Sequence, residues 1–400
     1  MELRAGYKQT EVGVIPEEWE VLSVSDVTKS FQNGFAFASH GYSKSGIPIV
    51  TMAQIGLDGR FKFKEEIVNH WPSSEASKLA TFQLFRGDII IAMTDVTPEK
   101  NLIGRMTEVT EDGPLLLNQR VGLLRLDPEK IDPYFLRAVS NSKMWRDYAR
   151  AVASLGVQAN IGTKEIQAGK LPVPPLPEQR AIAGALSDVD TLIGALDSAL
   201  AKRRDLKQAA MQQLLTGLKR LPGFHGEWEV KRLGDVVEII KGELITEKDA
   251  IPGNIPVIAG GKKPAYFHNR ANRAGKTITI SGSGASAGYV SFFEMPIFAS
   301  DCSTIREGPS YVIQFIYFVL HLRQGEIYRA QTGGAQPHIH PNDLRPMSIG
   351  VPQVAEQTAI AEVLSDMDAE LAALEQRRDK TRALKQGMMQ ELLTGRTRLV

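Results

Sequence analysis

The sequence predicts an α+β protein that is built twice, with two globular α+β bodies and one long coiled-coil helix after each body. Two repeats predict this fold class. LKQAAMQQLLTG at 206–217 returns as LKQGMMQELLTG at 384–395, and EWEV at 18–21 returns at 227–230. A repeat of this kind is settled first, because overlooking it would misassign the whole fold.

The repeat extends well beyond these two motifs. PEQRAIAGALSDVDTLIGAL at 177–196 matches AEQTAIAEVLSDMDAELAAL at 355–374, and LGVQANI at 155–161 matches GGAQPHI at 333–339. The offset is 178 positions here but 209 at EWEV, so the first body is 31 residues longer than the second. Since the ends of each unit agree and the middles differ, we expect a shared frame that presents two different recognition surfaces.

The segment after each body reads as one helix of roughly 38 residues, or about 57 Å at 1.5 Å per residue. Pro177 suits its first turn, and Gly217 suits a C-terminal cap. Lysines and arginines follow Leu200, and we expect the apolar seam to resume in a shifted phase near Leu206, Ala210 and Leu214. An ordinary helical hairpin or dimerisation coil would show the same periodicity. The apolar residues recur at spacings of three and four, as in a heptad seam, at Ile182, Leu186, Val189, Ile193 and Leu196 and, in the second copy, at Ile360, Leu364, Met367, Leu371 and Leu374.

The two bodies mix strands and helices. Runs such as IPIVTMAQI, GDIIIAMT and RVGLLRL in the first body, and NIPVIAGG and KTITISGSG in the second, predict strands bounded by Gly, Asp or Pro. Residues 131–152 and 310–331 each predict one helix in the matching place. The resulting segments are a first body at 1–176, a helix at 177–221, a second body at 222–354 and a helix at 355–400.

The composition narrows the class of protein. Hydrophobic residues make up 43% and charged residues 23% of the 400, as is ordinary for a globular chain. We find no apolar run long enough to span a membrane and no signal-peptide core, so we expect the cytoplasm. The one cysteine, Cys302, forms no internal disulfide and supports no zinc site. Because the formal net charge is +1, any contact with nucleic acid must depend on local charge.

The order of body, repeated helix, body, repeated helix resembles the specificity (S) subunit of Type I restriction–modification systems. The resemblance rests on IPEEWEV, VPPLPEQRAIAGALSDVDTLI and LKQAAMQQLLTG in the first half. It rests on LPGFHGEWEV, VPQVAEQTAIAEVLSDMDAEL and LKQGMMQELLTG in the second. These motifs span nearly the whole chain.

The resemblance implies that each body is a target-recognition domain reading one half of a split, asymmetric site in double-stranded DNA. It implies that the two helices pack antiparallel and act as a ruler between the half-sites. The helices would also dock two methyltransferase (M) subunits, to which restriction (R) subunits attach. The chain itself would perform no chemistry and need no cofactor.

A basic segment of the second body is one candidate for DNA contact. Residues 261–290 contain no Asp or Glu, and lysine and arginine neutralise phosphates and also reach guanine edges. A solvated loop is the simpler reading. Ser283 lies in GSGASAG, a turn whose serines could touch the DNA backbone. AGKT at 274–277 is not a phosphate-binding loop, because Arg270 stands where that motif needs Gly. The candidates in this segment are Lys262, Lys263, Tyr266, Arg270 and Arg273.

LNQR at 117–120 is the candidate in the first body, because Asn and Gln suit adenine and Arg suits guanine. The same side chains, Asn118, Gln119 and Arg120, could equally satisfy a turn. Its counterpart is ASDCSTIR at 299–306, which supplies Asp301, Ser303 and Arg306. Gln158 and Gln336 share one place in the repeat, which argues for loop architecture as much as for base contact. His338 and His340 have no third ligand nearby, so we expect no metal.

Two other functions would account for parts of the sequence. A stand-alone DNA methyltransferase needs an Asn/Asp-Pro-Pro-aromatic motif, which the sequence lacks, and a nuclease needs a carboxylate–lysine cluster that does not stand out. A coiled-coil scaffold that binds only protein explains the helices but not two divergent α+β bodies.

Overall fold

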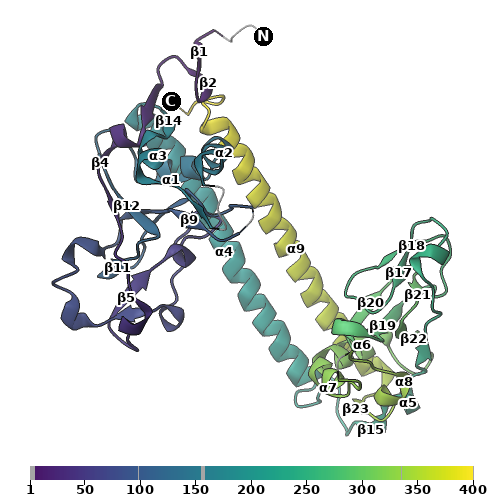
Figure 1. Ribbon diagram of the computed structural model, residues 1–400. Helices are drawn as coiled ribbons and strands as arrows, with labels where there is room; N and C mark the ends of the chain where they lie inside the picture. The colour runs from purple at the N-terminus through teal and green to yellow at the C-terminus, as the bar shows by residue number, and fades with distance from the viewer. Residues whose placement is uncertain (1–4, 98, 155–157, 335, 400) are drawn as a thin grey trace. The chain divides into compact units, whose positions relative to one another are not determined.

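The computed structural model describes residues 5–97, 99–154, 158–334 and 336–399. Contacts divide the chain into two compact units. Unit 1 comprises Met1–Ala195 and Arg378–Val400, and unit 2 comprises Leu196–Arg377. The division falls within both long helices, α4 (Leu176–Leu214) and α9 (Val354–Leu392), which Figure 1 draws in teal and yellow. Because this division cuts through the helices, the four segments named from the sequence stay a prediction.

Unit 1 is built on two four-stranded sheets. The first has the order β10-β8-β12-β4 and is antiparallel, and the second has the order β6-β5-β11-β7 with β5 and β11 parallel. The first sheet contains β4 (Thr28–Asn33), β8 (Ile89–Ala92), β10 (Met106–Glu108) and β12 (Val121–Leu126). The second contains β5 (Ile47–Val50), β6 (His70–Trp71), β7 (Gln83–Leu84) and β11 (Leu115–Leu117). Short pairs complete the unit: β1 (Tyr7–Thr10) with β2 (Gly13–Pro16), β3 (Glu20–Ser23) with β14 (Lys170–Val173), and β9 (Thr94–Asp95) with β13 (Ala159–Asn160).

Three short helices accompany these sheets: α1 (Pro133–Ser140), α2 (Lys143–Val152) and α3 (Thr163–Ala168). α1 begins where Asp132 accepts a hydrogen bond from the backbone N–H of Phe135 at 2.9 Å, with Pro133 in the first turn. The single helix predicted for 131–152 is wrong in one respect. It breaks after Ser140, because Ser142 is extended and caps a second helix at the N–H of Trp145.

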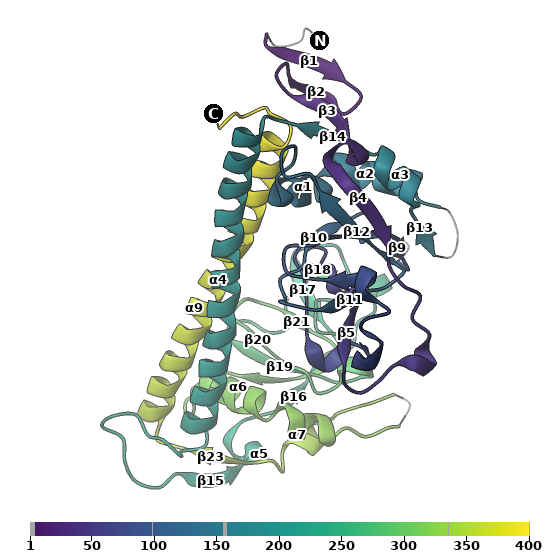
Figure 2. The same ribbon diagram turned by 90° about the vertical axis from the view of Figure 1, so that its left-hand side faces the viewer.

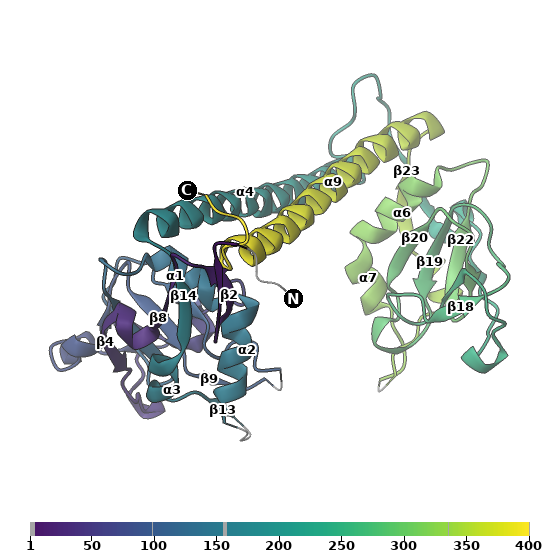
Figure 3. The same ribbon diagram turned by 90° about the horizontal axis from the view of Figure 1, so that it is seen from above.

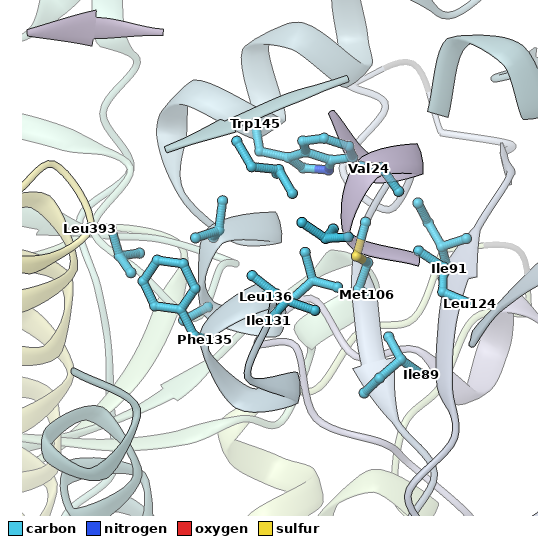
Figure 4. Packing of buried hydrophobic residues seen from close by; sticks show 14 of the residues in the cluster. Val24, Ile89, Ile91, Met106, Leu124, Ile131, Phe135, Leu136, Trp145 and Leu393 are labelled. Carbon is cyan, nitrogen blue, oxygen red and sulfur yellow. The ribbon is translucent and has the colours of Figure 1, made fainter. Parts of the chain in front are cut away.

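The core of unit 1 joins the first sheet to the long helices. α1 packs against β10, and Figure 2 shows it beside that sheet. Phe135 and Trp145 are fully buried, and Figure 4 shows Phe135 between Leu136 and Leu393, which follows the end of α9. Ile182 and Leu186 of α4 belong to the same cluster. The sheet, α1 and the nearby parts of both long helices therefore share one core.

Unit 2 repeats this plan. Its main sheet has the order β16-β22-β19-β20, and α6 packs on β19 and β20 (Figure 3). The helix predicted for 310–331 is divided at Arg323 into α6 and α7. The main sheet contains β16 (Ile240–Lys241), β19 (Thr277–Ser281), β20 (Val290–Phe293) and β22 (Cys302–Arg306). Around it lie β17 (Ile255–Ile258), β18 (Tyr266–His268), β21 (Phe298–Ala299), β15 (Glu229–Arg232), β23 (Ser348–Val351), α5 (Leu233–Val236), α6 (Ile313–Leu322), α7 (Gln324–Arg329) and α8 (Pro341–Leu344).

The long helices contact each other antiparallel within each unit. In unit 1, Glu178 pairs with Arg398, and Asp190 pairs with Lys385. The residue number therefore falls in one segment as it rises in the other, as in an antiparallel pair. Unit 2 contains the equivalent pairs, Glu356 with Arg220 and Asp368 with Lys207. The prediction of two α+β bodies with long antiparallel helices in an internal repeat is confirmed.

The apolar seam does not change phase, contrary to the sequence-based prediction. Lys207 lies seven residues after Leu200 and so occupies the next equivalent seam position, and its ammonium pairs with Asp368. Met211 and Leu214 then continue the seam as buried residues, whereas Leu206 is 46% exposed. The other seam positions are either buried or partly buried. Ile182, Leu186, Ile193, Leu196, Ile360 and Leu364 are buried, and Val189, Met367, Leu371 and Leu374 are half-buried.

Candidate nucleic-acid interface

One end of the main sheet has the same construction in both units. In unit 1 this end, called here the loop end, lies where β4 and β8 finish and β12 begins; in unit 2 it lies where β16 and β19 finish and β22 begins. Val121 pairs with Ala92 in one unit, and Cys302 pairs with Ser281 in the other. The strand registers therefore align the two loop ends residue by residue.

One glycine in each unit, Gly34 or Gly242, allows the chain to pass close to the backbone of the neighbouring strand at the loop end. The N–H of Gly34 donates to the carbonyl of Val121 at 3.3 Å, and the N–H of Gly242 donates to that of Cys302 at 2.8 Å. A Cβ at Gly34 would lie 2.2 Å from the Asn118 carbonyl oxygen, and one at Gly242 would lie 2.1 Å from the carbonyl oxygen of Ser300. A side chain at either glycine would push this segment of the chain away from the sheet.

The loop that follows the short helices is attached at the same point in each unit. The N–H of Ile161 donates to the Met93 carbonyl at 2.9 Å, and the N–H of Ile339 donates to the Gly282 carbonyl at 3.0 Å. The matched segments LGVQANI and GGAQPHI therefore end at equivalent places. Residues 155–157 and 335 of these segments lie outside the part that the structure describes.

The candidates of unit 1 gather at its loop end. Asn118 is buried, and its side-chain oxygen accepts from the N–H of Arg120 at 3.1 Å, so it shapes the turn. Gln119 and Arg120 are exposed beside it. Gln158 is half-buried, and its side-chain nitrogen has no hydrogen-bond partner in the described structure. The arrangement leaves Gln119 and Arg120 available to a ligand, whereas Asn118 is committed to the fold.

Four of the candidates of unit 2 also lie at its loop end. Ser283 follows β19 and donates to the carboxylate of Asp301. Lys262 and Lys263 are exposed in a loop that is fixed to this end, because the Ser281 hydroxyl donates to the Gly260 carbonyl at 2.7 Å. The fourth, Gln336, is exposed in the loop that ends at Ile339.

The other candidates of unit 2 already have hydrogen-bond partners within the unit or lie at the far end of the main sheet. Arg306 lies at the far end of β22, paired with Thr277, so it is away from the loop end. Arg270 donates to Glu243 at 2.8 Å, and the hydroxyl of Tyr266 donates to the Ile245 carbonyl at 2.5 Å. Glu243 and Ile245 follow Gly242 of the loop end, so Arg270 and Tyr266 are bonded to groups near this end, and DNA contact by these residues stays a prediction.

Arg273 has a structural set of contacts. Its guanidinium donates to the Thr304 hydroxyl and the Asn272 carbonyl, each at 2.9 Å, and to the Lys241 carbonyl at 3.2 Å. Burial, and then the charge of Arg306, hold the pKa of Arg273 below its ordinary value. All three nitrogens of its guanidinium already donate within the unit, which leaves this side chain poorly placed for guanine.

A cavity of about 260 Å³ opens at the loop end of unit 2. Burial raises the pKa of the Cys302 thiol in its wall to about 12, so this sulfur stays protonated at neutral pH. The rings of His338 and His340 stack with centroids 6.3 Å apart. Within the described ranges no group of three His, Cys, Asp or Glu could hold a metal ion. The polar and charged lining residues are Lys241, Ser283, Asp301, Cys302, Ser303, His338 and His340.

Sequence reasoning missed Lys241 and gave Asp301 only as a counterpart of LNQR. The strand register places Lys241 opposite Ser303, as Asn33 lies opposite Gly122 in unit 1. An available signal was the glycine that follows each of these residues, Gly34 and Gly242. The sequences around these two glycines differ too much for the match to be recognised without the structure.

A polar joint fixes each body to the start of its own long helix. The indole N–H of Trp19 donates to Glu178 at 2.9 Å, and Arg398 donates to the same carboxylate at 2.8 Å. In unit 2, Trp228 and Arg220 donate to Glu356 at 3.2 and 2.6 Å. The repeated EWEV motif and the repeated glutamate thus recur because they are partners in one joint.

A glutamine beside each joint extends it into the body. Gln179 accepts from the N–H of Asp132, the capping residue of α1, at 2.8 Å, and donates to the Pro174 carbonyl at 2.9 Å. Gln357 accepts from the N–H of Val312 and donates to the Pro352 carbonyl, both at 2.9 Å. The orientation of each body on its helix is therefore set by the same side chains.

Among the helices of the described residues, none is both long and apolar enough to cross a membrane. A family model described as "Type I restriction modification DNA specificity domain" matches the chain twice, at residues 16–201 and 225–382. The two matches cover both repeats.

Named relatives agree with the family match. The chain is 27% identical over 421 residues to the "Putative type I restriction enzyme MjaX specificity subunit" of Methanocaldococcus jannaschii, covering 98% of this chain and 97% of that one. It is 30% identical over 220 residues to the "Type I restriction enzyme MjaVIII specificity subunit" of the same organism, covering 55% and 50%.

Solved structures share the fold at lower identity. The S subunit of a Type I restriction–modification system from M. genitalium matches with a TM-score of 0.66 at 16% identity over 98% of both chains. A chain from a study of the assembly and conformational transition of the type I R-M system matches with a TM-score of 0.54 at 17% identity, over 95% of this chain and 99% of that one.

Proposed function

This chain belongs to the Type I restriction modification DNA specificity family, and we propose that each of its units reads one half of a split, asymmetric DNA site within a Type I complex. One observation carries the proposal. The two loop ends share a frame, with Gly34 matching Gly242, yet expose different residues at matched positions. A common frame with exchanged side chains is what two readers of different sequences require.

The residues proposed to meet DNA are the candidates at the loop ends that are exposed or partly exposed. In unit 1 they are Gln119, Arg120 and Gln158. In unit 2 they are Lys262, Lys263, Ser283 and Gln336. Exposed lysines supply sequence-independent attraction to phosphates, and arginine and glutamine suit base edges. Asn118, Tyr266, Arg270 and Arg273 are assigned supporting roles at most, because hydrogen bonds within their units already engage their polar groups. Arg306 is assigned the same, because it lies at the far end of β22.

We propose two methyltransferase subunits as partners, and restriction subunits through them. The duplication supports a stoichiometry of two, since each partner surface in one copy of the helix returns in the other. Leu206 and Leu384 hold equivalent places in the repeat and are 46% and 60% exposed, which marks one apolar contact per copy. In this proposal the chain recognises the DNA site, and the partner subunits carry out methylation and cleavage. The complex acts in the cytoplasm, where the DNA is modified.

Methylome sequencing tests this function. Cells that carry the chain with its methyltransferase should gain methylation at a bipartite motif with unlike halves and a spacer of fixed length, and cells without the chain should lose it. Binding of S-adenosylmethionine by the purified chain alone, or methylation without a split motif, would contradict the proposal.

A further inference from the structure

Arg120 and Asp301 occupy the same position in the two loop ends. Arg120 precedes Val121, which pairs with Ala92, and its carbonyl accepts from the N–H of Met93 at 3.0 Å. Asp301 precedes Cys302, which pairs with Ser281, and its carbonyl accepts from the N–H of Gly282, also at 3.0 Å. The shared backbone places a cation in unit 1 where unit 2 has a carboxylate.

The Asp301 side chain is held in place but not neutralised. One carboxylate oxygen accepts from the Ser283 hydroxyl, and a Cβ on Gly282 would lie only 2.8 Å from the other. No lysine or arginine of the described chain forms an ion pair with this carboxylate. It lines the cavity together with Lys241 and His340, both exposed. The carboxylate therefore presents an oriented acceptor at the loop end.

Arg120 presents the opposite chemistry. Its side chain is exposed, and among the residues that the structure covers it has no ion-pair partner. Its N–H is fixed by Asn118, so the turn that carries the side chain is ordered. A guanidinium can donate two parallel hydrogen bonds, a geometry that matches the O6 and N7 acceptors of guanine.

A carboxylate that faces DNA has few favourable partners. It repels phosphates, so it does not serve as a backbone anchor. It accepts well from a base amino group, and the N4 amino group of cytosine is the usual partner of Asp and Glu in the major groove. Lys262 and Lys263, exposed in the loop beside this end, provide the positive charge that offsets the local repulsion.

Building on the proposed function, we propose that Arg120 reads a guanine in one half-site and that Asp301 reads the amino group of a cytosine in the other. Arg120 is a hydrogen-bond donor and Asp301 is an acceptor at the matched position of the two units, so the two half-sites differ there. Asp301, with Ser283 as its positioning residue, is thus a specificity-determining residue of unit 2.

The test uses the full chain assembled with its methyltransferase and a pool of duplexes randomised within the half-site read by unit 2. Asp301→Asn replaces a pure acceptor with an amide. We expect discrimination in favour of cytosine at one position to fall by roughly 5- to 100-fold. Other positions and the half-site read by unit 1 should not change. Arg120→Gln should relax one guanine in that other half-site.

Glu294→Gln is the matched control, since it removes one exposed carboxylate beyond the opposite end of the sheet, after Phe293. It should leave the motif unchanged. Asp301→Ser is a second variant with the same expected relaxation, for use if the amide prevents folding. Thermal unfolding of each variant separates a folding defect from a change of specificity.

The outcomes separate this inference from the function on which it rests. If the wild-type complex methylates a split motif and Asp301→Asn keeps the same cytosine preference, the assignment of Asp301 is wrong and the function stands. Equal loss of methylation on all sequences would likewise overturn it, by showing a role without base selectivity. If the wild-type complex shows no split motif, the proposed function itself fails.

Discussion

Lys385 donates to both carboxylate oxygens of Asp190 at 2.8 Å. The equivalent pair in the repeat is Lys207 with Asp368, and it forms within unit 2 just as the first forms within unit 1. Each unit therefore combines the first part of one long helix with the last part of the other. The duplication is reciprocal: each copy of the helix completes the core of the body that belongs to the other copy.

Asp190 should make unit 1 sensitive to acid. Burial alone would raise the pKa of Asp190, but hydrogen bonds from Lys385 and Tyr134, with the charges of Lys385 and Arg60, bring it below its ordinary value. A carboxylate with a depressed pKa contributes stability that is present above its unfolded pKa of about 3.9 and is lost as the pH falls through the folded value. We expect Asp190→Asn to cost about 1–3 kcal/mol at pH 7 and to remove part of the acid dependence.

Urea unfolding at pH 7 and at a series of pH values below 5 measures both effects. Asp188→Asn changes an exposed carboxylate two residues earlier on the same helix and should alter neither. An equal loss of stability at every pH for Asp190→Asn would show that the ion pair does not cause the acid dependence.

The long helices could be predicted from the sequence because their signal is local and repeated. A seam with spacings of three and four identifies the buried face without knowledge of the partner. Lys207 was misread because a lysine in an apolar pattern looks like an interruption. Only the structure shows Asp368 beside it. The capping side chain of Ser142, which divides a predicted helix in two, is similarly a small local preference inside a long apolar pattern.

The candidate site was only partly predictable, because the sequence does not show whether a charged side chain is exposed or is hydrogen-bonded within the fold. Arg273 looked like a DNA contact, yet its guanidinium holds the carbonyls of Lys241 and Asn272. Lys262 lies in the same basic segment and is exposed. The match of Arg120 with Asp301 depends on strand register, which the divergent bodies do not reveal.

The glutamate joint should stabilise the unit in which it lies. Glu178 is fully buried, and Arg398→Ala would leave its carboxylate with the Trp19 indole as its remaining side-chain donor among the described residues. We expect a loss of about 2–4 kcal/mol, because one partner of a buried ion pair is left uncompensated. Hydrogen exchange should show the loss of protection in unit 1.

Arg220→Ala is the reciprocal variant, since it removes the equivalent donor to Glu356 in unit 2. Its loss of protection should fall in that unit. Arg396→Ala removes a nearby exposed arginine and serves as the control. Equal effects of Arg398→Ala and Arg396→Ala would argue against the joint.

The apolar seam should control assembly with the methyltransferase. Leu196 is 5% exposed, and Leu196→Asp would bury an unpaired charge at a cost of several kcal/mol or separate the helices locally. Co-purification of the methyltransferase should be lost or weakened. Ala201→Asp places the same charge on an exposed position of the same helix and should be tolerated. Full assembly by the Leu196 variant would refute the assigned seam.

The two units should be exchangeable readers. Replacement of residues 231–347 by the corresponding body of another family member should change one half of the methylated motif. The half read by residues 22–169 should stay the same, because each loop end is built within its own unit. Methylome sequencing of cells with the chimaera checks this. A change in both halves would be incompatible with two independent readers.

The exposed lysines and the engaged arginine of the basic segment should behave differently in a salt series. Lys262 and Lys263 are exposed, and each lost phosphate contact reduces the magnitude of the slope of log K against log salt by roughly 0.9. Lys262→Ala/Lys263→Ala should therefore weaken binding of the complex to all sequences alike. Arg273→Ala should instead cost about 1–3 kcal/mol of folding stability, because its acceptors lose their donors, and leave the slope unchanged.

Lys248→Ala controls for net charge, since Lys248 is an exposed lysine of the same unit outside this segment. Binding is measured for the assembled complex, and stability by thermal unfolding of the chain. A clear reduction in the magnitude of the slope for Arg273→Ala, with no loss of stability, would show that this arginine contacts DNA. An unchanged slope for the lysine pair would leave their loop solvated and shift the search for phosphate contacts to Lys241, the exposed lysine at the rim of the cavity.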